Sequence, residues 1–123
     1  MAGTLVISTL SDGTNSTSAT NAISGSAKAW VNFNGSTSPG TIRASYNIAS
    51  ITKNSTGNYT ITFSTAVGSN PVAIGTGSDQ LSYGTFVDIG SVSTTYVTVY
   101  TYNHNTGSGA NGDSIFYTAV FSS

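Results

Sequence analysis

Cysteine and glutamate are absent from the 123-residue sequence, and only Lys28, Arg43 and Lys53 are cationic. Without cysteine the chain has neither disulfide bonds nor thiolate chemistry. Three scattered cations in a chain of net charge −1 cannot neutralise a phosphate backbone, which argues against nucleic-acid binding. No apolar run approaches the ~20 residues that cross a bilayer, and no basic segment precedes an apolar stretch as in a secretory signal. We therefore expect no membrane insertion.

Strong helix formers are also scarce, since the chain lacks glutamate and has little leucine. Seven tyrosines, five phenylalanines and many valine, isoleucine and threonine residues are present instead. These residue types favour a pleated, half-buried surface, and they supply apolar area that disordered chains lack. The composition predicts an all-β fold.

The first part of the chain differs in composition from the rest. Thr4–Leu10 predicts a strand, and residues 11–26 are small and polar apart from Ile23, which is typical of a linker or a loosely paired arm. We therefore divide the chain into an N-terminal strand and polar arm, residues 1–26, and a sandwich domain, residues 27–123.

Alternating apolar residues indicate strands through the sandwich domain. The strand predicted at 27–33 places Val31 and Phe33 in the core and Trp30 on the opposite face, partly exposed. A five-residue turn at 54–58 predicts a hairpin whose second strand buries alternate residues from Tyr59 to Phe63. Further strands are predicted at 42–46, 48–53, 71–75, 85–91, 95–102 and 114–121.

About eight short strands separated by turn signals predict a single antiparallel β-sandwich, jelly-roll-like, with an extended N-terminal arm. In the 95–102 strand, three tyrosines share one face and Val97 and Val99 share the other. Residues 115–121 are apolar on both faces, which places that strand in the middle of a sheet or against a neighbouring subunit.

Catalytic patterns are weak. His104 is the single histidine, so neither a zinc site nor a specific Ser-His-Asp triad is indicated, and no GxSxG elbow is present. Asp12 and Asp79 follow serine in turn-like contexts, where the side chain caps its own backbone, which argues against a glycosidase carboxyl pair. We expect no enzymatic activity and no cofactor.

The glycine-rich loop 103–114 is a candidate binding site. Its amide and carboxylate oxygens suit Ca²⁺, which takes about six to eight oxygen ligands, but a single carboxylate makes any such site weak. The alternative is a solvated loop shaped by asparagine and glycine, serving as a distal contact surface. The residues assigned to this loop surface are His104, Asn105, Asn111 and Asp113.

The aromatic side chains outnumber what the core of one small sandwich needs. Tyrosine and tryptophan concentrate at subunit and ligand interfaces, because their rings are apolar while one end forms hydrogen bonds. We predict an interface, either with other copies of the chain or with a ligand such as a saccharide that stacks on the rings. The alternative is ordinary outward-facing sheet aromatics. The residues assigned to this interface are Trp30, Tyr46, Tyr96, Tyr100 and Tyr102.

Three segments, AKAWVNFNG at 27–35, IRASYNIASIT at 42–52 and NSTGNYTITF at 54–63, resemble a short all-β module of bacteriophage virion proteins, especially tail fibres and related appendages. The resemblance covers about a third of the chain. It implies a non-enzymatic virion protein on the particle surface, assembled in the host cytoplasm, and a homotrimer, since fibres and knobs of this class are commonly trimeric.

The resemblance implies a small trimeric accessory subunit of a tail or head fibre that contacts the host. The N-terminal arm would then attach it to other virion proteins or intertwine with neighbouring copies. A capsid decoration or cement protein is one alternative. A carbohydrate-binding module that uses surface aromatics, for example on host cell-surface glycans, is the other.

Overall fold

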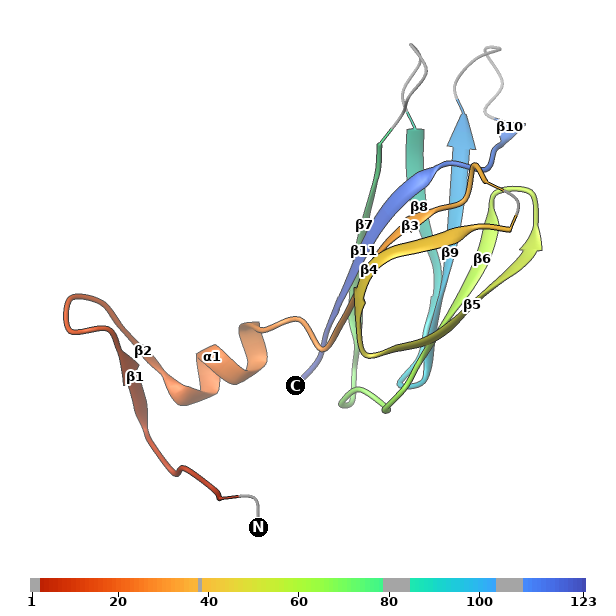
Figure 1. The fold of residues 1–123 in the computed structure, drawn as a ribbon. Helices are drawn as coiled ribbons and strands as arrows, with labels where there is room; N and C mark the ends of the chain where they lie inside the picture. Colours follow the sequence, from red (N-terminus) through yellow and green to blue (C-terminus); the bar gives the residue numbers. More distant parts are fainter. Residues whose placement is uncertain (1–2, 38, 79–84, 104–109) are drawn as a thin grey trace.

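The fold is seen in a computed structural model that describes residues 3–37, 39–78, 85–103 and 110–123. A β-sandwich carries a separate N-terminal arm on one side (Figure 1). The elements in chain order are β1 (Thr9–Ser11), β2 (Ser16–Ser18), α1 (Ala19–Gly25), β3 (Ala29–Asn34), β4 (Thr41–Tyr46), β5 (Ile48–Ser55), β6 (Asn58–Phe63), β7 (Val72–Ser78), β8 (Thr85–Val92), β9 (Tyr96–Asn103), β10 (Ala110–Asn111) and β11 (Ile115–Phe121).

Two antiparallel sheets form the sandwich. The first has the strand order β4-β3-β11-β7. The second has the order β8-β9-β6-β5, and the short β10 pairs with the end of β9. The predicted all-β antiparallel sandwich is confirmed, with eight strands in the two main layers besides β10 among the described residues. β11 lies between β3 and β7, as its apolar character on both faces predicted.

The alternation of side chains along the strands builds the core. In β3, Val31 and Phe33 are buried while Trp30 is exposed, as predicted. Val97 and Val99 of β9 are fully buried from the opposite sheet. A strand side chain that points inward is followed by one that points outward, so these faces follow from sequence position alone.

The β5–β6 hairpin is present, but its turn is shorter than predicted. Pairing continues to Ser55 opposite Asn58, so Thr56 and Gly57 alone form the turn. Gly57 has φ +67°, a left-handed conformation that glycine adopts without steric cost. The five-residue turn was therefore wrong in length, because the backbone pairs through asparagine and serine residues that sequence reasoning assigned to the loop.

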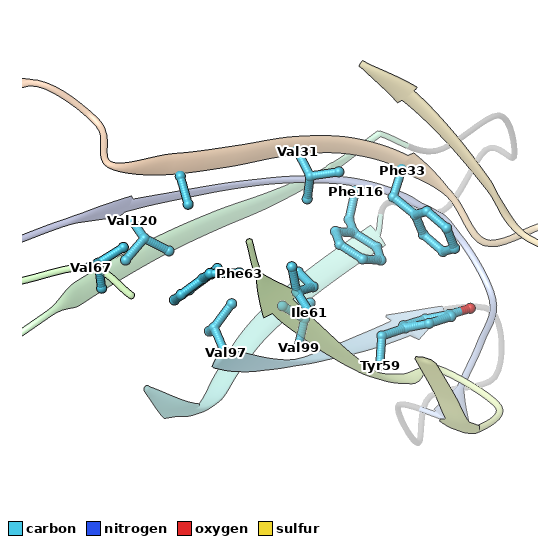
Figure 2. Packing of buried hydrophobic residues seen from close by; sticks show 11 residues of the cluster. Val31, Phe33, Tyr59, Ile61, Phe63, Val67, Val97, Val99, Phe116 and Val120 are labelled. Carbon is cyan, nitrogen blue, oxygen red and sulfur yellow. The ribbon is translucent and has the colours of Figure 1, made fainter. Parts of the chain in front are cut away.

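Figure 2 shows side chains of the two sheets meeting in the core. Three rings pack together at one end: Phe33 and Phe116 from the first sheet and Tyr59 from the second, with centroids 5.3–5.4 Å apart. Tilted and edge-on arrangements at this separation are favourable for aromatic rings. The hydroxyl of Tyr59 points to the end of the core, where it can reach polar partners.

Asn47 turns the chain from the first sheet to the second, between β4 and β5. Its φ of 58° lies in the left-handed region, which asparagine tolerates better than most residues. Its side-chain amide donates to the carbonyl oxygens of Lys28 and Thr65, at 3.0 and 2.9 Å, and its side-chain oxygen accepts from the backbone N–H of Thr65 at 2.8 Å. One residue thus fastens three segments at this corner.

The two lateral sides of the sandwich differ. On one side β7 lies directly beside β8, and a Cβ at Gly77 would stand 2.4 Å from the Thr85 side chain and 2.9 Å from its carbonyl oxygen. Glycine permits this close approach, so β8 covers the edge of β7. On the other side β4 is an edge strand whose six residues are all exposed.

The arm differs from the prediction. Residues 4–8, predicted as part of a strand, lie in no strand, and only Thr9–Ser11 pairs with Ser16–Ser18. Asp12 fixes this hairpin by accepting from the backbone N–H groups of Thr14 and Asn15, at 2.9 and 2.7 Å. The strand prediction from Thr4 was wrong because β2 ends at Ser18, where α1 (Ala19–Gly25) begins, so residues 4–8 have no partner strand in the described part of the chain.

A short helix, α1, occupies part of the segment interpreted as a linker. Ser18 caps it by accepting from the backbone N–H of Asn21 at 3.1 Å, a favourable arrangement at a helix N-terminus. No helix among the described residues has the length and apolar character needed to cross a membrane.

Candidate functional site

Trp30 and Tyr46 lie directly opposite each other on β3 and β4. They lie on the outer face of the first sheet, since their neighbours in β3, Ala29 and Val31, face the core. Trp30 is 40% exposed and Tyr46 is 58% exposed. The structure therefore brings together two of the predicted interface residues, on a surface that the sandwich itself does not cover.

The strand register extends this aromatic pair into two rows across the sheet. The first row runs from Tyr46 through Trp30 and Ala119 to Ile74, and the second from Ala44 through Asn32 and Tyr117 to Thr76. Between the rows the face is hollowed by about 470 Å³. None of the described residues that line the hollow is charged. We call this hollow the sheet groove.

The other predicted interface residues lie on the second sheet. Tyr96, Tyr100 and Tyr102 alternate with the buried Val97, Val99 and Thr101, so they point outward from β9. A Cβ at Gly90 would stand 2.5 Å from the ring of Tyr100, so this ring covers Gly90 on β8. The five predicted residues therefore form two groups on opposite outer faces. The sequence assigned them to one interface because it does not show which strands belong to the same sheet.

Asp113 belongs to a polar cluster rather than to an open loop. Its Oδ1 accepts from the hydroxyl of Tyr59 at 2.5 Å and from the backbone N–H of Gly57 at 3.0 Å. Its Oδ2 forms an ion pair with Lys53. All three partners come from the β5–β6 hairpin, so Asp113 fastens that hairpin to the segment leading into β11.

The cluster changes the acidity of both titrating groups. Partial burial acts to raise the pKa of the Asp113 carboxyl, but hydrogen bonds from Lys53, Tyr59 and Gly57 outweigh it and hold that pKa below its ordinary value. Burial raises the pKa of the Tyr59 hydroxyl, and the neighbouring Asp113 carboxylate raises it further. The cluster thus favours a charged Asp113 and a neutral Tyr59.

The remaining residues of the predicted loop surface fall outside the described part of the chain. His104 and Asn105 lie there, and of Asn111 only the backbone, in β10, is described. Among the described residues there is no group of three or more His, Cys, Asp or Glu side chains that could hold a metal ion. The calcium interpretation stays a prediction.

Sequence reasoning missed part of the exposed apolar surface. In the arm, Leu5 and Val6 are 81% and 89% exposed, and Ile7, Leu10 and Ile23 are also exposed. These five residues, which we call the arm face, border a second hollow of about 410 Å³. The run Leu5-Val6-Ile7 was visible in the sequence, but it was interpreted only as part of the strand Thr4–Leu10.

The chain matches no family model, no curated protein and no solved structure. The candidate site therefore rests on the sheet groove, the arm face and their chemistry.

Proposed function

We propose that this protein is a non-enzymatic structural subunit of a bacteriophage virion, a small trimeric accessory component of a tail or head fibre that is exposed on the particle and contacts the host. The resemblance of residues 27–63 to virion appendage modules supports the choice of particle. The observation that carries the proposal is the uncharged sheet groove beside Trp30, together with the exposed Tyr46 opposite Trp30 on β4, both of which one subunit leaves open.

This surface suits assembly for two physical reasons. Apolar area that is exposed in the monomer and covered in an oligomer contributes favourably to association. Burying an uncharged face also avoids the desolvation penalty that charged groups incur. The arm gives each copy a second apolar surface with which to contact neighbouring copies or other virion proteins.

Two measurements test the proposal. Light scattering at micromolar concentration is expected to give the mass of three 12.5 kDa subunits. Immunogold labelling of purified particles is expected to mark the tail or a head fibre. Label spread over the capsid lattice would instead favour a decoration protein, and absence from purified particles would overturn the virion assignment.

A carbohydrate-binding module is the second candidate. The adjacent Trp30 and Tyr46 rings beside an open groove are the observation that favours it, since sugar rings stack on exposed aromatic side chains. Glycan-array binding that is lost in Trp30→Ala and retained in Tyr100→Ala, with both variants folded, would place a sugar on the first sheet. If the native protein and both variants bind no glycan on the array, this candidate is rejected.

A further inference from the structure

Residues 4–10, which precede the turn of the arm, carry much uncovered apolar surface. Leu5 and Val6 are almost fully exposed, although both are aliphatic. In Figure 1 the arm lies beside the sandwich and joins it through the residues between α1 and β3. The Lys28 ammonium donates to Ile23 O and Ser26 Oγ at this junction. The arm face is thus only partly covered by its own subunit, since Ile7 and Leu10 are about half buried while Leu5 and Val6 are not.

The sheet groove has the complementary property. It is apolar, and its described lining includes Trp30, Ile74 and Tyr117. Its volume of about 470 Å³ lies within the range of ligand-binding pockets, roughly 300–1,000 Å³. Two polar atoms of lining residues, the side-chain oxygens of Asn32 and Thr118, are buried without a hydrogen-bond partner among the described residues.

We propose that residues 4–10 of one copy dock in the sheet groove of a second copy. This inference rests on the proposed self-assembly and names the surfaces that mediate it. Neither surface brings a charge to the contact, because Thr4–Leu10 contains no charged residue and the described groove lining contains none. Each surface supplies the apolar cover that the other lacks in one subunit.

The dimensions of the two surfaces agree. Four strands spaced about 4.8 Å apart make a face roughly 15–20 Å wide. Seven residues in extended conformation span roughly 23 Å, so residues 4–10 are long enough to cross all four strands of the first sheet.

The contact is head-to-tail, since each copy donates one arm and offers one groove. Such heterologous contacts close into a ring when the rotation that relates neighbouring copies is a whole-number fraction of a full turn. A ring of three copies leaves every arm docked and every groove filled. This is the assembly that the proposed trimer requires.

Two full-length variants test the contact separately. In the arm variant, Leu5→Asp with Ile7→Asp places charges on the arm face and leaves the groove intact. In the groove variant, Ala44→Glu with Ile74→Glu places charges at two exposed positions of the groove and leaves the arm intact. Each is expected to weaken self-association roughly a hundredfold or more, because a docked charge would lose its hydration.

Matched controls carry the same charges elsewhere. Ser16→Asp with Thr20→Asp changes exposed positions of the arm outside the arm face. Ser50→Glu with Thr52→Glu changes exposed positions of β5 on the second sheet. Both controls are expected to keep the native oligomer, and circular dichroism checks that all four variants keep the native fold.

Mixing the two test variants is the decisive measurement by light scattering. Each alone is expected to be a monomer, and the equimolar mixture is expected to form a dimer, because the intact arm of one fits the intact groove of the other. A groove variant that stays oligomeric, or folded variants that do not complement, would overturn the inference. If both variants remain trimers, the docking fails while the trimeric assembly stands; a monomeric native protein removes both.

Discussion

The hydroxyl of Tyr59 donates a hydrogen bond of 2.5 Å to Oδ1 of Asp113, a residue 54 positions later in the chain. The ring of the same tyrosine packs on Phe33 and Phe116 in the core. Tyr59 therefore connects the apolar interior to the polar cluster that holds the β5–β6 hairpin against the segment before β11.

Replacement of Asp113 by asparagine is expected to destabilise the fold by about 2 kcal/mol, because hydrogen bonds to a charged group are lost or weakened. Urea unfolding at neutral pH measures the effect. Asp88→Asn changes an exposed aspartate on β8 and is the matched control. Equal stability of the two variants would show that the cluster contributes little.

The pH dependence follows from the two pKa directions. The lowered pKa of Asp113 stabilises the fold above the ordinary carboxyl pKa, about 3.9, and this contribution is lost as the pH falls through the lowered value. The raised pKa of Tyr59 contributes stability that is fully present below about 10, the ordinary tyrosine pKa, and is lost as the pH rises above it.

Tyr59→Phe isolates the alkaline part of this dependence. Above about pH 10 the native protein is expected to lose up to about 1.4 kcal/mol per pH unit more than the variant, since only unfolded Tyr59 ionises there. Denaturant unfolding is measured at several pH values from roughly pH 8 to pH 11, which brackets the ordinary tyrosine pKa. The slope of unfolding free energy against pH is then compared between the native protein and the variant. Equal slopes for the native protein and Tyr59→Phe would contradict a raised pKa of Tyr59 in the folded state.

Gly35→Ala is expected to destabilise the fold by about 1–3 kcal/mol, because a Cβ there would stand 2.4 Å from the Tyr59 hydroxyl oxygen and 2.9 Å from Cζ of its ring. Gly25→Ala is the control, since nothing lies within 4 Å of its Cβ position. Thermal melting compares the two variants. A Gly35 variant as stable as the control would mean that the Tyr59 ring can shift at no cost.

Asn47→Gly tests the corner between the sheets. Glycine keeps the φ of 58° available but removes the side chain that bonds Lys28 and Thr65, so a loss of about 2 kcal/mol is expected. Asn70→Gly, at a second position with φ near 50°, controls for the backbone effect. Chemical denaturation that ranks the two variants equally would remove the fastening role of Asn47.

The sequence predicts the faces of strands well but not their neighbours. Alternation placed Val31, Val97 and Trp30 correctly, because the period of two decides inside from outside within each strand. It could not separate Trp30 from Tyr100, since membership of a sheet depends on pairing between distant segments. The contact of Tyr59 with Asp113 likewise leaves no local pattern.

The arm was the weakest part of the prediction. α1 has seven residues, too few for a helical apolar period to be recognised, and a helix so short is marginal by itself. The cap at Ser18 was its one local signal. The interpretation of Leu5-Val6-Ile7 as a strand failed because apolar composition does not reveal whether a partner strand is available.

The close approach of β7 and β8 at Gly77 affects how the protein can aggregate. With that side covered, a further strand can join the first sheet only at β4. If two molecules paired through β4, each would cover the free edge of the other, and the combined sheet would have no free edge for a third molecule. Edge-to-edge growth of the first sheet therefore ends at the pair.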